Sequence, residues 1–145
     1  MKEVKATEFS KEFSDMIKEM QGLEDETIKF SEDMWKITNN PLIQMTMDII
    51  KHDSEKHKVM QQMILDSLSK ESLHLMPEEL GVLASVLEKH IDAESKSLKL
   101  AEKALDNCEL FSTKYILSML ISDEKKHHGM LGQLSELKKA TVFVT

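Results

Sequence analysis

Hydrophobic residues recur with a helical period over four long segments of the chain, at about 10–38, 41–68, 77–106 and 109–139. Within each segment they fall three or four positions apart and form one stripe, which is the pattern of a helix that buries a single face. Polar breaks at 38–41 and 106–109 indicate tight turns, and a looser polar connector covers 69–76. The pattern predicts an all-α fold in which two helical hairpins form a single four-helix domain over residues 1–145.

Residues that favour helix starts support these boundaries. Asn40 precedes a proline, which predicts an N-cap followed by proline in the first helical position. Pro77 is followed by two acidic residues in the first turn, where the helix dipole favours them. Asp106 and Glu109 have the spacing of a capping box for the fourth helix. The tail 141–145 alternates as a strand does, and we expect it to be a docked or frayed terminus.

Acidic and histidine side chains interrupt every apolar stripe. The interruptions are Glu24 in the first predicted helix, Asp53 and His57 in the second, His90 and Glu94 in the third, and Asp123, Glu124 and His127 in the fourth. Glu24 lies 16 residues before Asn40 and His57 lies 17 residues after it. At ~1.5 Å per residue, both stand about 24–26 Å from that turn. Glu94 and His127 stand in the same relation to residue 110, so each antiparallel hairpin is expected to bring one Glu and one His to a common level.

The two predicted hairpins also align with each other when the sequence is shifted by 70 residues. The shift gives seven identities between residues 13–68 and 83–138. Three of the seven are polar interruptions of the stripes, and they pair Glu24 with Glu94, Asp53 with Asp123, and His57 with His127. The hairpins are therefore expected to be pseudo-repeats that arose by internal duplication.

Charge and cysteine content narrow the classes of partner. The chain has 26 acidic residues against 19 basic ones, all of them Lys, and a formal net charge of -7. Without Arg it lacks the forked donor and the positive field that bind nucleic acid, so no nucleic-acid partner is expected. The single Cys108 allows no internal disulfide and no four-cysteine metal site. Apolar runs are only a few residues long, so we expect a cytoplasmic protein with no membrane partner.

The polar layer within the apolar stripes needs a neutralising charge. Each ionised carboxylate that leaves water costs several kcal/mol even after the protein relaxes. Three sources remain open: protonation of the carboxyl groups, ion pairs with Lys56 and Lys126 at the margin of the stripes, or a bound metal ion. In a chain without Arg, only a metal satisfies several carboxylates and two imidazoles together. Oxygen and imidazole donors suit iron or manganese better than zinc.

The fourth predicted helix carries Glu124-Lys125-Lys126-His127, a Glu-x-x-His motif whose spacing lets both side chains reach one ion. With Glu24, His57 and Glu94 on the other helices, it resembles the ferritin-like di-iron carboxylate superfamily, and the stretch 123–131 is most similar to the rubrerythrin-like branch. The resemblance implies a ferritin-like four-helix bundle that binds two iron ions, with manganese or zinc as alternatives. It implies ferroxidase or peroxidase chemistry with these five residues as metal ligands. It also implies a homodimer and a separate electron donor.

The second predicted helix departs from the family pattern at one position. Ser54 stands where the family's first bridging Glu belongs, three residues before His57, and Asp53 on the same face is the candidate substitute. The alternatives are a single metal ion, or a degenerate bundle that serves as a non-catalytic interaction or structural protein. His90 is open as an added ligand, a hydrogen-bond donor to Glu94 or a neutral core histidine. The spacing of His90 and Glu94 also resembles a hemerythrin-like dioxygen or iron binder, which ranks third because it leaves the first helix without a role.

The connector limits how the two hairpins can be joined. A ferritin-like crossover has to span ~42 Å between residues 68 and 77 if both helices run their full predicted length, whereas eight extended residues reach only ~27 Å. The crossover, which the resemblance favours, therefore requires the second helix to stop near Leu65 and the third to start nearer Leu80 or Gly81. A simple up-down-up-down bundle is the alternative.

Overall fold

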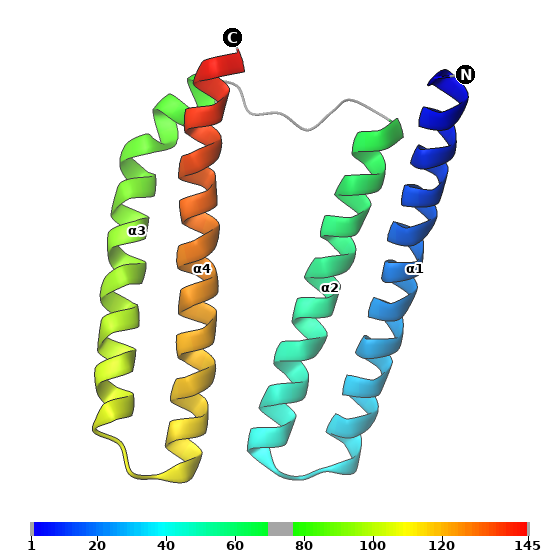
Figure 1. The fold of residues 1–145 in the computed structure, drawn as a ribbon. Helices are drawn as coiled ribbons and strands as arrows, with labels where there is room; N and C mark the ends of the chain where they lie inside the picture. The colour runs from blue at the N-terminus through cyan, green and yellow to red at the C-terminus, as the bar shows by residue number, and fades with distance from the viewer. Residues whose placement is uncertain (1, 70–76, 145) are drawn as a thin grey trace. The chain divides into compact units, whose positions relative to one another are not determined.

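The structure is a computed structural model that describes residues 2–69 and 77–144, with side chains described from 11 to 68 and from 78 to 136 except at 80. It contains four α-helices and, over these residues, no strand. They are α1 (Lys2–Ile37), α2 (Pro41–Ser69), α3 (Pro77–Asp106) and α4 (Phe111–Val144). The chain divides into two compact units, Met1–Leu73 and His74–Thr145, and each contains one helical hairpin (Figure 1). The predicted all-α fold of four helices is confirmed.

The first and last helices of the chain, α1 and α4, are longer than predicted. α1 begins at Lys2 rather than near residue 10, and α4 continues to Val144. The prediction that 141–145 forms a docked or frayed tail is therefore wrong for residues 141–144, which extend the helix. Each β-branched residue in the segment 141–144 disfavours the helix by less than about 0.7 kcal/mol. With no Gly or Pro after residue 132, nothing in the sequence ends the helix earlier.

Asn40 caps the turn between α1 and α2 as predicted. Its Oδ1 accepts a hydrogen bond of 2.9 Å from the backbone N–H of Leu42. The Thr38 hydroxyl oxygen accepts another, 3.0 Å long, from the backbone N–H of Asn40. The side-chain amide of Gln44 returns from α2 to donate to the Thr38 carbonyl at 2.9 Å. These bonds satisfy backbone groups that a helix end leaves free, so the first turn is closed by its own side chains.

The turn between α3 and α4 is built differently. Asp106 is the last residue of α3, so the predicted capping box of Asp106 and Glu109 is wrong. The side chain and the backbone N–H of Asn107 both donate to the Lys103 carbonyl, at 2.9 Å and 3.2 Å, and they close the end of α3. α4 starts at Phe111, and the Leu110 carbonyl accepts its first helical hydrogen bond. An aliphatic residue therefore occupies the N-cap position and supplies no side-chain acceptor.

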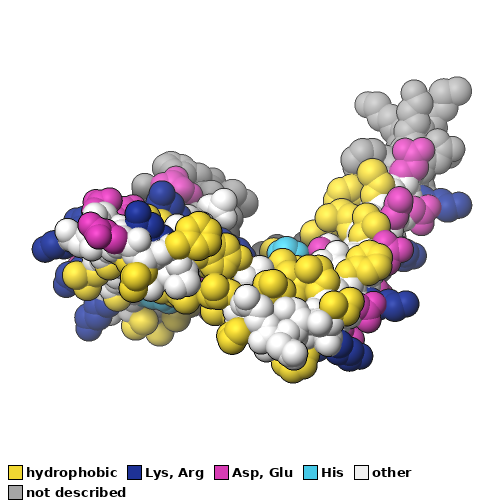
Figure 2. Space-filling view, turned by 90° about the horizontal axis from the view of Figure 1, so that it is seen from below, with side chains coloured by type: hydrophobic (Ala, Val, Ile, Leu, Met, Phe, Trp, Pro, Cys, Tyr) yellow, Lys and Arg dark blue, Asp and Glu magenta, His cyan; other side chains and the backbone are white. Residues whose placement is uncertain are grey.

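Each hairpin leaves much of its apolar surface uncovered. Ile17, Ile121 and Leu131 are the buried hydrophobic residues among those described, whereas side chains such as Phe30 and Val86 are more than half exposed. A view onto the turn ends shows hydrophobic side chains gathered on the surface of each hairpin (Figure 2). Two helices can cover only one face of each other, so the remaining stripe needs another partner. Among the described helices, none combines the length and apolar character needed to cross a membrane.

The helices that flank the connector run their full predicted length. α2 ends at Ser69 and α3 begins at Pro77, whereas the crossover expectation required α2 to stop near Leu65 and α3 to start nearer Leu80 or Gly81. The early helix ends that a crossover would require are therefore not found, because helical structure continues through 65–69 and 77–81. The connector itself, at 70–76, lies outside the described residues.

Candidate metal centre

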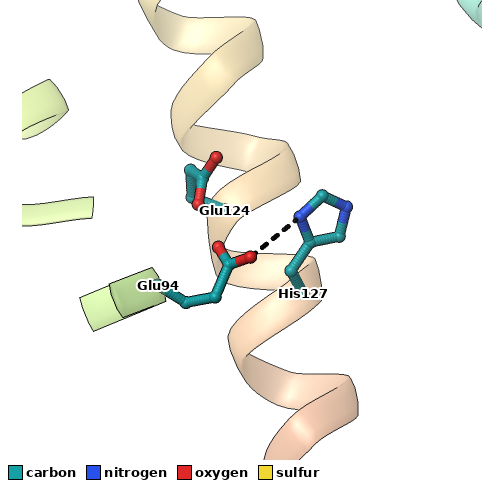
Figure 3. Close-up of side chains that lie close together, drawn as sticks. All are labelled: Glu94, Glu124 and His127. Atoms are coloured by element: carbon teal, nitrogen blue, oxygen red, sulfur yellow. Dashed lines mark ion pairs between the residues drawn. The ribbon is translucent and has the colours of Figure 1, made fainter. Parts of the chain in front are cut away.

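In the second hairpin, three predicted ligands converge. The carboxylates of Glu94 and Glu124 and the imidazole of His127 each offer a ligand atom, and these atoms lie within 4.8 Å of one another. Glu94 extends from α3 towards α4, where Glu124 and His127 stand one turn apart on the same face (Figure 3). Nδ1 of His127 lies 3.7 Å from Oε1 of Glu94. Two acidic oxygens and one imidazole nitrogen therefore face a common point.

The two carboxyl groups of this cluster shift each other's pKa in opposite directions. A hydrogen bond from the Glu124 carboxyl lowers the pKa of Glu94, with burial opposing the shift and His127 and His90 assisting it. The same bond to Glu94 raises the pKa of Glu124, and burial and the charge of Glu94 act in the same direction. Two adjacent carboxylates are rarely both ionised, because their charges repel in a poorly solvated site. Without a cation, the arrangement therefore favours an ionised Glu94 beside a Glu124 that holds its proton more tightly than usual.

One oxygen of this cluster is left without a hydrogen-bond donor. Oε2 of Glu94 is buried, and none of the described groups donates a hydrogen bond to it. A buried acceptor without a partner is destabilising, so this atom requires either the proton of Glu124 or a bound cation. His90 approaches the other oxygen, with its Nε2 at 3.4 Å from Oε1 of Glu94. Within its hairpin the His90 side chain is exposed and lies beside Glu94.

In the first hairpin, Glu24 from α1 faces His57 from α2. Nδ1 of His57 lies 3.2 Å from Oε1 of Glu24. The side-chain amide of Gln61 donates to the same carboxylate oxygen at 3.4 Å. Ser54, three residues before His57, is buried. This hairpin therefore holds one carboxylate and one imidazole, with an amide beside them and a hydroxyl where the second hairpin has Glu124.

The remaining predicted residues are placed less centrally. Asp53 is half-buried and Asp123 is exposed. Within the described part of the chain, neither forms a hydrogen bond or ion pair with the Glu or His of its hairpin, although the charge of Asp123 contributes to the raised pKa of Glu124. Lys56 and Lys126 are both exposed, and no ion pair to a ligand carboxylate is seen for either in these residues. Among the described residues, neither Lys56 nor Lys126 therefore neutralises a ligand carboxylate through an ion pair.

Sequence reasoning missed Gln61. It follows His57 by four residues on the same helical face, so its position in the stripe was readable from the i,i+4 spacing. Because a single amide in an apolar stripe carries no formal charge, it does not stand out as a carboxylate does.

The donor set of the second hairpin fits a transition-metal ion. Carboxylate and imidazole together are typical ligands of iron, manganese and zinc, and the buried Oε2 of Glu94 lacks the partner that a cation would supply. Comparison with protein-family models, with curated proteins and with solved structures gives no significant match to this chain. The interpretation of the centre therefore rests on its own donor atoms.

Proposed function

We propose that this chain is a non-haem iron-binding protein of the ferritin-like type, with ferroxidase or peroxidase chemistry at one or two iron ions. One observation carries the proposal: ligand atoms of Glu94, Glu124 and His127 lie within 4.8 Å of one another, and Oε2 of the same Glu94 is buried without a hydrogen-bond partner among the described groups. The Glu24 and His57 pair supports it, because the same two residue types meet 70 positions earlier. Manganese and zinc are the alternative ions for these donors.

We further propose that the chain has the fold class of a ferritin-like four-helix bundle made of two pseudo-repeated hairpins. The exposed hydrophobic residues of each hairpin support this fold class, because an apolar stripe that two helices leave uncovered is what a four-helix bundle buries. Dimerisation of two such chains remains part of the same proposal.

Bound iron would exchange electrons with dioxygen, peroxide or further ferrous ions. The chain supplies the ligands and a partly dry surrounding. Binding of a cation would favour the ionised form of Glu124, whose pKa is raised in the metal-free hairpin. With Cys108 as the single cysteine, electrons have to come from a separate donor or from ferrous iron itself.

A degenerate bundle without catalysis is the second candidate. It is favoured by one observation, the buried Ser54 where a bridging carboxylate is expected. Such a protein would use its exposed apolar stripes for contact with a partner and would gain no stability from metal. A true site raises the melting temperature, because the ion binds only the native state.

Titration with Fe(II) separates the two candidates. Anaerobic addition to the purified full-length protein should show saturable binding of one or two equivalents per chain, and admission of air should then produce a ferric absorption band. Elemental content of protein purified without chelator is the companion measurement. Retention of less than about 0.2 equivalents of any transition metal, with no change in melting temperature, would overturn the metal proposal.

A further inference from the structure

Gln61 is the most enclosed polar side chain at the first-hairpin pair. Its residue surface is 5% exposed. Its Nε2 donates to Oε1 of Glu24 at 3.4 Å, whereas its own Oε1 is buried without a hydrogen-bond donor. A buried amide oxygen with no partner destabilises a fold, so such an atom is retained where something else pairs with it. The unpaired atom here is an oxygen, which pairs with a proton donor or with a cation.

The position of Gln61 makes a cation the better partner. It lies one helical turn after His57, on the face that also presents the imidazole to Glu24. The residue 70 positions later is Leu131, which is buried and apolar. The two hairpins therefore differ in a reciprocal way. The second has a carboxylate three residues before its histidine, and the first has a buried amide four residues after its histidine.

We infer that Gln61 supplies the third donor of a metal site in the first hairpin, through Oε1, together with Glu24 and His57. The inference rests on the proposed function and adds a ligand to it. A side-chain amide oxygen is a neutral ligand that divalent cations accept. The Nε2 group of the same side chain holds Glu24 by its hydrogen bond, so one residue both orients the carboxylate and offers an oxygen.

The inferred site carries less negative charge than the centre of the second hairpin. It contains one carboxylate, one imidazole and one amide, whereas Glu94, Glu124 and His127 provide two carboxylates and an imidazole. Fewer anionic ligands mean weaker binding and faster exchange of a divalent ion. The chain is therefore expected to hold one ion firmly in the second hairpin and a second, exchangeable ion at Glu24, His57 and Gln61.

The test uses full-length protein in which Glu94→Gln weakens the second hairpin, so that binding to the first can be followed alone. Titration with Mn(II), followed by electron paramagnetic resonance of the free ion, should give a measurable Kd. Adding Gln61→Leu, which copies the apolar residue of the second hairpin, should raise that Kd by about tenfold or more. The matched control is Gln62→Leu, because Gln62 is exposed and hydrogen-bonds only to Gln21 and Asp66 in the described contacts. The control should leave the Kd unchanged.

A direct measurement covers the case in which Gln61→Leu alters folding. In uniformly 15N-labelled protein with no substitution, Zn(II) should shift the side-chain amide signal of Gln61 together with the ring nitrogen signals of His57. Signals of Gln62 should stay in place. Helical content from circular dichroism shows whether the variant is folded.

The outcomes distinguish the two proposals. If the second hairpin binds metal but neither Gln61→Leu nor Zn(II) addition affects the first, the assignment of Gln61 is wrong and the proposed function stands. If the Gln61 signal stays fixed while the His57 signals move, the first hairpin binds metal without this ligand. If neither hairpin takes up Fe(II), Mn(II) or Zn(II), both proposals fail together.

Discussion

The two hairpins place the same pair of residues in contact and surround it with different chemistry. Glu24 meets His57 at 3.2 Å, and Glu94 meets His127 at 3.7 Å, 70 positions later in both cases. The second pair has Glu124 beside it, and the first has a buried amide. The difference shows that the height of a residue above a helical turn determines which side chains meet. What the meeting point can bind is determined by the residues one turn away.

The largest expected difference between the hairpins lies in metal affinity. Glu94→Gln removes a carboxylate from the more anionic cluster and should weaken its binding of Fe(II) roughly 100-fold, at the upper end of what changes around a metal site produce. Glu24→Gln should affect only the weaker site. Calorimetric titration of the two variants measures both.

Glu102→Gln is the matched control for this prediction. It removes a carboxylate from the same helix at an exposed position away from the cluster. Equal effects of Glu94→Gln and Glu102→Gln would show that metal binding depends on net charge and not on these ligands.

A second substitution makes the hairpins alike. Ser54→Glu places a carboxylate at the position that matches Glu124 and should strengthen metal binding in the first hairpin about tenfold. Without metal, the same variant should unfold at a lower temperature, because a second acidic group then lies beside Glu24. Metal titration in the Glu94→Gln background and thermal unfolding with chelator measure the two effects. Ser54→Ala is the control, and tighter binding by that variant would contradict the explanation.

The turns allow a comparison that does not involve metal. Asn40→Ala removes the side-chain cap of α2 and should lower the free energy of unfolding by about 1 kcal/mol. Leu110→Asn adds a cap at the start of α4 and should raise it by a similar amount, about 0.5–1 kcal/mol. Urea unfolding with chelator present measures both. A destabilising effect of Leu110→Asn would show that the exposed leucine makes a contact that the described structure does not contain.

The smallest expected effect is a pH dependence that arises from Glu94 and Glu124 of the second hairpin. Because the pKa of Glu124 is raised above 4.5, its protonation stabilises the fold fully at low pH, and this stabilisation is lost as the pH rises through the raised value. Glu94, whose pKa is lowered, contributes in the opposite sense, and its stabilisation is lost only as the pH falls through that lower value. In metal-free protein, Glu124→Gln should therefore gain stability relative to the unsubstituted chain as the pH increases above 4.5, by a few degrees in Tm. Thermal unfolding in chelator across this range tests it, and a difference that does not vary with pH contradicts the opposed pKa shifts.

Helical periodicity predicted the four helices because each stripe is long and its breaks contain turn residues. The meeting of Glu24 with His57 and of Glu94 with His127 also follows from arithmetic along the helix axis, since equal distances from a turn place residues at equal heights.

The errors in the sequence-based predictions have different physical causes. The capping box at 106–109 has the right residue types, but α3 continues to Asp106, and the side chain of Asn107 ends it instead. Gln61 was missed because burial of an uncharged amide depends on how α1 packs over it, which spacing within α2 does not reveal. Whether a terminal segment frays depends on the cooperativity of the helix before it, so alternation in five residues is too short to decide.

In both Glu and His pairs, the carboxylate side chain is more buried than the imidazole. The side chains of Glu24 and Glu94 are 18% and 15% exposed, whereas those of His57 and His127 are 46% and 49% exposed. Within each hairpin, the imidazole is therefore the more accessible donor of the pair and the carboxylate is the more enclosed one. If the proposed ion binds, the imidazole is the ligand of each pair that a chelator in solution reaches most easily.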